Sequence, residues 1–130
     1  MSVKLKTVGV IVKDMKKTLD FYQHLGLAIP AGSDREENLD LELPNGIVIG
    51  FLTEQMAKSA DPQFITPVGQ AINLQFEYDS PEEVDAIYAK LIGLGYESYR
   101  EPWDAFWGQR FARVKDPDYG IVNLYAQLNE

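Results

Sequence analysis

The 130-residue chain contains no cysteine and only one histidine, and each scarcity excludes a class of chemistry. Without cysteine, the chain has no disulfide framework, no thiolate metal site and no cysteine nucleophile. The single histidine, His24, lies near the C-terminal end of a predicted helix, where the helix dipole favours a partly exposed side chain. One helical histidine cannot form a catalytic triad by itself. The lack of cysteine agrees with a cytoplasmic location, which we expect.

Long apolar runs and a basic stripe are also missing. No apolar run approaches the roughly 18 residues that a membrane-spanning helix needs. The short apolar stretch near the N-terminus alternates with other residues, which favours a strand over a signal peptide. Twelve Lys and Arg residues against twenty Asp and Glu residues leave a net charge of −8, and the basic residues form no stripe. We therefore expect neither nucleic acid nor a membrane as a partner.

The chain does contain an internal repeat with an offset of 66 residues. The segment TVGVIVKDMKKTLDFYQHL, from Thr7, matches NLQFEYDSPEEVDAIYAKL, from Asn73. Each copy predicts a strand and then a helix that begins after Asp14 or Ser80, both of which are good helix N-caps. Further strands are predicted at 38–44, 47–52, 96–102, 110–115 and 121–128.

The repeat predicts an α+β fold for a single domain that spans residues 1–130. Its two modules cover about 1–53 and 70–130, and a linker at about 54–69 holds a short helix near 54–59. Alternation along the strands places one set of apolar side chains beneath the helices. In the first module this predicted core set is Val8, Val10, Val12, Ile47, Ile49 and Phe51.

The opposite face of the strands carries small and neutral polar side chains instead of lysine and glutamate. Buried amide side chains need hydrogen-bond partners, so this composition favours a cavity that holds a ligand. A solvated sheet face is the alternative. The residues on this face are Thr7, Gly9, Gly50, Asn73, Gln75, Asn123 and Tyr125.

Both tryptophans of the chain lie in one segment, WDAFWGQR, at 103–110. Trp103 and Trp107 can fill the end of a core, as tryptophan often does. Alternatively, they form a flat wall that stacks on an aromatic or cationic ligand. The other residues that we place in this candidate binding site are Phe51, Phe106, Tyr125 and Arg110.

The repeat, the opening VKDMKKTLDFY and the closing WGQRFARVKDPD together resemble the vicinal oxygen chelate superfamily, which includes glyoxalase I, extradiol dioxygenases and bleomycin resistance proteins. The resemblance covers nearly the whole chain. It implies two paired βαβββ modules that form a curved mixed sheet around a ligand, and a homodimer, often with exchanged segments. The stretch GYESYREPWDAFWGQRFARVKDPD, with two tryptophans around the turn before GQR, most resembles the corresponding stretch of mitomycin-binding and bleomycin resistance proteins.

The same resemblance bears on metal chemistry. Metal-dependent members bind a divalent ion through four side chains, mostly His and Glu. None of the residues at the matching positions supplies an anionic or imidazole ligand, so we expect no metal, no other cofactor and no catalytic residue. The matching positions here are Thr7, Gly50, Asn73 and Asn123.

The resemblance therefore implies a non-catalytic protein that binds a planar or aromatic, antibiotic-like small molecule. One alternative is an enzyme of the same fold, a lyase or dioxygenase with a shifted metal site or with Glu77 or Asp40 as a base. Another is an interaction module whose sheet only mediates dimerisation. The turn DPDYG at 116–120 places its glycine one residue later than the family's DPDG, and a slip of one residue there would exchange the faces of the last strand.

Overall fold

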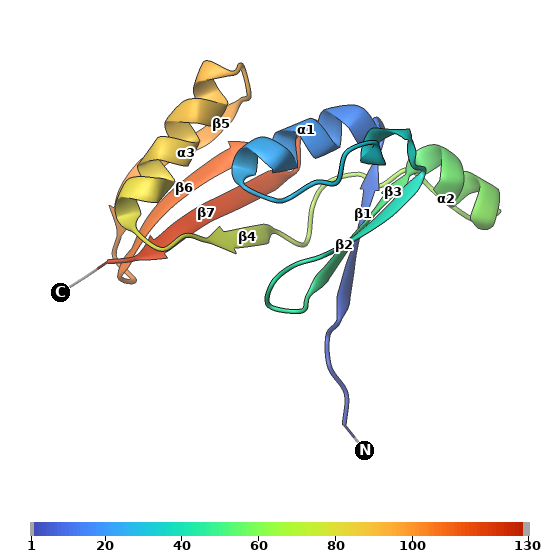
Figure 1. Ribbon diagram of the computed structural model, residues 1–130, viewed down its shortest axis with the longest axis horizontal. Coiled ribbons are helices and arrows are strands. Elements are labelled where there is room, and N and C mark those ends of the chain that lie inside the picture. The colour runs from blue at the N-terminus through green and yellow to red at the C-terminus, as the bar shows by residue number, and fades with distance from the viewer. Residues whose placement is uncertain (1, 129–130) are drawn as a thin grey trace. The chain divides into compact units, whose positions relative to one another are not determined.

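The computed structural model describes residues 2–128 and consists of two compact units, Met1–Val68 and Gly69–Glu130. Each unit contains its own sheet (Figure 1). The boundary between the units falls at the end of the expected linker, and the short helix expected near 54–59 is present within that linker. None of the helices in the described part of the chain is long and apolar enough to cross a membrane.

The first unit, unit 1, holds a three-stranded mixed sheet in the order β1-β3-β2. Strand β1 runs parallel to β3, and β2 runs antiparallel to it. Helix α1 follows β1, and α2 follows β3 directly. The elements are β1 (Thr7–Val12), α1 (Met15–Leu25), the 3-10 helix η1 (Ser33–Arg35), β2 (Asn38–Glu42), β3 (Val48–Thr53) and α2 (Glu54–Ala60).

The second unit, unit 2, holds a four-stranded mixed sheet in the order β4-β7-β6-β5. Strand β4 is parallel to β7, and the other neighbours are antiparallel. Both units thus build βαβββ-like modules, which confirms the expected α+β class, although unit 1 has one strand fewer among its described residues. The elements are β4 (Leu74–Glu77), α3 (Pro81–Gly93), β5 (Ser98–Ala105), β6 (Gln109–Lys115) and β7 (Ile121–Gln127).

The long helices α1 and α3 begin where the repeat predicts. The Asp14 side chain accepts a hydrogen bond from the backbone N–H of Lys17, and the Ser80 side chain accepts one from Glu83. Each cap satisfies a backbone donor that the first helical turn leaves unpaired. Helix α1 ends at Gly26, whose φ of 125° is open to glycine at little cost.

The core of unit 1 confirms part of the predicted apolar set. Phe51 is fully buried on β3, and its ring centroid lies 5.2 Å from that of Tyr22 on α1. Ile49 is also buried, but the prediction for Ile47 is wrong, because 37% of this residue is exposed. Ile47 precedes β3 and belongs to the hairpin turn, where its backbone N–H donates to Asn45 Oδ1.

In unit 2, helix α3 packs on strands β5, β6 and β7. Val84 and Leu91 of α3 are fully buried, and so are Val114 on β6 and Leu124 on β7. Because side chains alternate along a strand, burial of these residues turns their neighbours to the other face of the sheet. We call that other face, which lies away from α3, the open face of unit 2.

The turn between β6 and β7 keeps β7 in the register that the sequence predicts. Asp116 Oδ1 accepts hydrogen bonds from the backbone N–H groups of Asp118, at 2.9 Å, and Gly120, at 2.8 Å. Tyr119 takes the left-handed conformation, with a φ of 65°. The displaced glycine is therefore accommodated by strain at one residue, and Asn123 stays on the open face.

Candidate functional site

Two rows of side chains run across the open face of unit 2, because laterally paired residues project to the same side of a sheet. The first row starts with a carboxylate and continues with three aromatic rings. Its four residues, one on each strand in the order of the sheet, are Glu77, Tyr125, Phe111 and Trp103. We call this the aromatic row.

The second row is polar and positively charged. Its members are Gln75, Asn123, Arg113 and Arg100. The first three lie two residues along their strands from the aromatic row, and Arg100 lies three residues from Trp103 because β5 has a register irregularity between them. We call this the arginine row. Arg113 Nε donates a hydrogen bond of 2.9 Å to Asn123 Oδ1, and Asn123 is 6% exposed. The Arg113 guanidinium carbon also lies 4.8 Å from the centre of the Tyr99 ring.

The aromatic row is part of a larger cluster that includes Trp107, in the turn between β5 and β6. The ring centroid of Phe111 lies 5.4 Å from both tryptophans, edge to face, and 6.1 Å from Tyr125 in a stacked arrangement. Trp103 and Trp107 are 6.0 Å apart and perpendicular. Edge-to-face and offset contacts at these separations are favourable for aromatic rings.

The exposed fraction of these rings shows whether each tryptophan fills the core or forms part of a surface that a ligand can contact, and it decides the question for Trp107. Trp107 is 49% exposed and Phe106, which contacts it edge to face, is 96% exposed. Trp103 is half-buried within β5, and Phe111 beneath the tryptophans is buried. Trp107 Nε1 donates to Gln109 Oε1 at 2.9 Å, which holds the exposed indole in place. Trp107 therefore presents an ordered aromatic surface, and Phe111 forms its base.

Arg110 and Phe51 were expected in the site, and neither lies on the open face of unit 2. Arg110 pairs with Ala126 on the face that packs against α3, where its guanidinium contacts Asp85 and Asp104 at 3.0 Å each. The hydrogen bond to Asp85 raises the pKa of Arg110. Phe51 is enclosed in the core of unit 1. The physical reason is alternation: the strand residues next to Phe111 and Gly50 necessarily point to the opposite face.

The four positions that the resemblance assigns to metal ligands are divided between the units. In unit 1, Thr7 and Gly50 share one face of the sheet. Asp40 pairs with Gly50 across β2 and β3, and its Oδ1 lies 2.9 Å from the place that a Cβ on Gly50 would take. The Asp40 carboxylate therefore covers Gly50. In unit 2, Asn73 is exposed in the coil before β4.

These positions do not fit a divalent cation. The side-chain oxygen of Asn123 already accepts a hydrogen bond from the Arg113 guanidinium, whose positive charge opposes a cation at that oxygen. Thr7 and Gly50 offer no charged or imidazole ligand. Among residues 2–128, no group of three or more His, Cys, Asp or Glu side chains could hold a metal ion.

Sequence reasoning missed three residues of the open face: Phe111, Arg113 and Arg100. The signal for the first two was present in the stretch RFARVK, which alternates on either side of the buried Ala112 and Val114. Arg100 could not be found in this way, because β5 contains register irregularities between Ser98 and Trp103 that break simple alternation.

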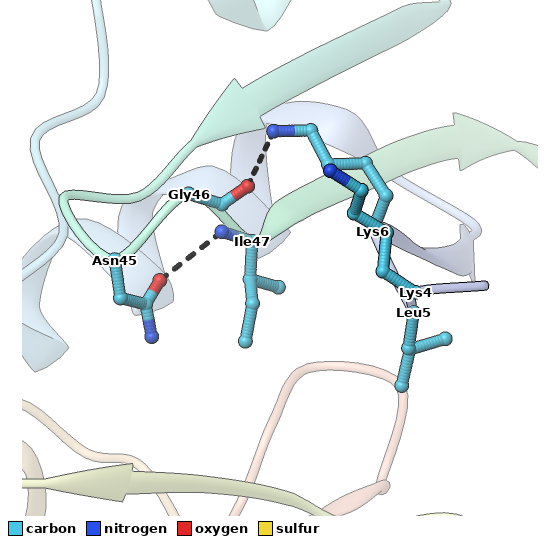
Figure 2. Close-up of a pocket in the computed structure, with 6 residues that line it drawn as sticks. All are labelled: Lys4, Leu5, Lys6, Asn45, Gly46 and Ile47. Carbon is cyan, nitrogen blue, oxygen red and sulfur yellow. Dashed lines mark hydrogen bonds between the residues drawn. The ribbon is translucent and has the colours of Figure 1, made fainter. Parts of the chain in front are cut away.

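An open depression of about 500 Å³ lies in unit 1. Figure 2 shows it between the segment before β1 and the hairpin that joins β2 to β3. Lys6 Nζ donates to the carbonyl of Gly46 at 2.6 Å, so one of its two lysines is already engaged. Its lining residues are Lys4, Leu5, Lys6, Asn45, Gly46 and Ile47, none of which belongs to the expected site.

Comparison with known proteins places the chain in a family. The chain is 32% identical to the uncharacterized protein YraH of Bacillus subtilis (strain 168), over 97% of this chain and all of that protein. A glyoxalase/bleomycin resistance protein/dioxygenase family enzyme from Burkholderia phytofirmans has a similar fold, with a TM-score of 0.82 at 21% identity over 97% of this chain and all of that one.

A glyoxalase-related enzyme from Fulvimarina pelagi is also similar in fold, with a TM-score of 0.80 at 18% identity, over 95% of this chain and 88% of that chain. The family match itself extends over residues 4–123 and so includes both units. The chain belongs to the Glyoxalase/Bleomycin resistance protein/Dioxygenase superfamily.

Proposed function

We propose that this protein binds a planar or aromatic small molecule without transforming it, as a drug-sequestering or resistance protein does. The observation that carries the proposal is the continuous aromatic surface on the open face of unit 2. It joins Trp103, Trp107, Phe111 and Tyr125 through ring centroids no more than 6.1 Å apart. Sequestration requires neither a nucleophile nor a base.

The exposure of this surface supports a ligand as its occupant. Large aromatic side chains bury a great deal of apolar area when they are covered, and each favourable ring contact adds about 0.5–1.5 kcal/mol. Trp107 is half exposed although its indole N–H is already hydrogen-bonded, so a ligand would gain the apolar face of the ring at no cost in lost hydrogen bonds. Neutral hydrogen-bonding groups lie beside the aromatic rings, at Gln75, Asn123 and Gln127.

The resemblance of residues 95–118 to mitomycin-binding and bleomycin resistance proteins suggests an antibiotic-like ligand. We propose that the protein acts as a cytoplasmic homodimer, as that resemblance implies. The aromatic surface lies within unit 2, so the proposal of ligand binding depends on that unit alone and can be tested whatever the state of association.

The test is titration of tryptophan fluorescence with mitomycin C, bleomycin and other planar antibiotics. We expect at least one compound to shift or quench the emission, and Trp107→Ala to weaken its binding about tenfold, because a ring contact and its buried area are lost. Trp103 remains as the reporter in that variant. Leu94→Ala, which truncates an exposed apolar side chain beyond the end of α3, is the control and should leave binding unchanged.

An emission spectrum that no planar compound perturbs would overturn the proposal. The same holds if Trp107→Ala lowers the thermal stability but binds every ligand as the native protein does, because Trp107 would then serve the structure only.

A further inference from the structure

We propose that the arginine row binds an anionic group, so that the ligand of the aromatic row is a planar aromatic acid with a carboxylate on Arg113 and Arg100. The inference rests on the proposed function, because both rows lie on the same open face. It assigns the chemical class of the ligand and the residues that select it.

The first argument is the placement of like charges. Arg100 and Arg113 are direct register partners across β5 and β6. Like charges directly opposite each other destabilise a strand pair. The chain carries a net charge of −8, so acidic residues for neutralisation are plentiful in its sequence. A pair of arginines in this position indicates that something other than the strand pairing itself favours them.

The second argument is that the neighbouring basic groups are neutralised and these two are not. Arg110 contacts Asp85 and Asp104, and Lys115 Nζ lies 2.7 Å from Glu97 Oε2, a hydrogen bond that raises the pKa of Lys115. Within residues 69–128, no carboxylate oxygen lies within 4.0 Å of the guanidinium nitrogens of Arg100 or Arg113.

The third argument is the orientation of the two guanidinium groups. The Nε–H of Arg113 donates to Asn123 Oδ1, and this hydrogen bond fixes the orientation of the two terminal amino groups of the guanidinium. The planar fork matches a carboxylate with two parallel hydrogen bonds. The Arg100 guanidinium carbon lies 3.5 Å from the centre of the Trp103 ring, which places a second cation at the edge of the aromatic surface.

The spacing of the two rows limits the size of the ligand. Phe111 and Arg113 are two residues apart on β6, which is roughly 7 Å along a strand. A fused two-ring acid that contacts the half-buried rings of Trp103 and Tyr125, in the same row as Phe111, can therefore bring its carboxylate to Arg113. Exposed charges that lie further than about 10 Å from the two guanidiniums are largely screened at 0.1 M salt, so distant acidic residues oppose an anion there only weakly.

The experiment is equilibrium dialysis of the full chain at neutral pH with 2-naphthoate and 2-naphthamide. The two compounds share their rings and differ in charge. We expect 2-naphthoate to bind about tenfold more tightly, since a hydrogen bond to a charged group contributes at least the 1.4 kcal/mol that a tenfold preference represents. Arg113→Gln should remove this preference and leave the affinity for 2-naphthamide unchanged.

Arg110→Gln is the matched control, because it removes the same charge from the same strand on the opposite face of the sheet. It should keep the preference for 2-naphthoate. If Arg113→Gln unfolds, Arg100→Gln takes its place, with a weaker preference as the expected result; thermal unfolding of each variant verifies the fold.

Equal affinities of the native protein for the two compounds would overturn this inference and leave the proposed function intact. Binding of neither compound would also overturn the inference, whereas the proposed function is decided separately by the fluorescence titration with planar antibiotics. A preference that Arg110→Gln reduces as strongly as Arg113→Gln does would also overturn the inference, because it would reflect the total charge of the chain and not the arginine row.

Discussion

Tyr119 shows at the residue scale how a turn can hold a non-glycine residue in the left-handed conformation and still keep the register of the next strand. It occupies the turn between β6 and β7 with a φ of 65°, a conformation that costs a non-glycine residue about 1 kcal/mol or more. Two backbone hydrogen bonds to Asp116 hold the turn in place. The strain at Tyr119 is tolerated because these hydrogen bonds, together with the pairing of β6 with β7, fix the backbone conformation of the turn.

Replacement of Tyr119 by glycine should therefore raise the free energy of unfolding by about 0.5–1 kcal/mol, since glycine adopts a positive φ with little strain. The Tyr119 side chain is 72% exposed, so its removal sacrifices little buried area. Urea unfolding followed by circular dichroism measures the change. Tyr119→Ala removes the same ring but keeps the strain. Equal gains for the alanine and glycine variants would show that strain is not the cause.

At the scale of an element, side-chain hydrogen bonds fix where helix α3 begins. The Ser80 hydroxyl accepts from the backbone N–H of Glu83 at 3.3 Å, while the Glu83 carboxylate accepts from the backbone N–H of Asp79 at 3.1 Å. Pro81 occupies the first helical turn, where a missing N–H costs nothing. These contacts set the start of α3, and α3 in turn covers the back of the sheet that carries both rows.

Loss of the Ser80 cap should destabilise helix α3 and therefore the fold of unit 2. Ser80→Ala should lower the free energy of unfolding by about 1 kcal/mol, because one backbone donor of the first turn loses its partner. Ser80→Asp, which keeps an acceptor at the same place and suits the positive end of the helix dipole, should unfold close to the native midpoint. Thermal or urea unfolding compares the three proteins. An alanine variant as stable as the native protein would contradict this account of the helix start.

Metal binding is a question for the whole molecule, because the positions that correspond to metal ligands are shared between both units. Thr7 and Gly50 belong to unit 1, and Asn73 and Asn123 belong to unit 2. The Arg113 guanidinium beside Asn123 disfavours a cation at that position. The family match gives the fold, but these residues determine whether metal chemistry of the family's usual kind fits this chain.

We therefore expect dialysis against Ni²⁺, Zn²⁺, Fe²⁺ or Mn²⁺, followed by metal analysis, to leave far less than one ion per chain. The melting temperature should be the same with EDTA and with each metal, because a ligand stabilises a fold only to the extent that it binds the native state. Arg113→Gln is informative in the same assay, since it removes the opposing charge. A tightly bound ion at one per native chain would contradict our assignment and favour an enzyme.

The predictions from sequence succeeded where local physics decides. The caps at Asp14 and Ser80 and the faces of β7 follow from side-chain chemistry and period-two alternation, and the structure confirms them. The prediction failed for Ile47, because a hairpin turn and not the strand sets its exposure. Arg110 was expected in the site, yet it is the neighbour of Phe111 along β6, and neighbours along a strand point to opposite faces.

The sequence by itself determined the α+β class, the helix starts and the strand face that carries neutral polar side chains. Each of these follows from residue patterns within a short stretch of chain. Only the tertiary structure decided which side chains meet across strands. The order β4-β7-β6-β5 places Arg100, Arg113 and Asn123 side by side, and this order arises from hydrogen bonding and burial between distant segments. For that reason the two tryptophans were visible in the sequence, but the arginine row beside them was not.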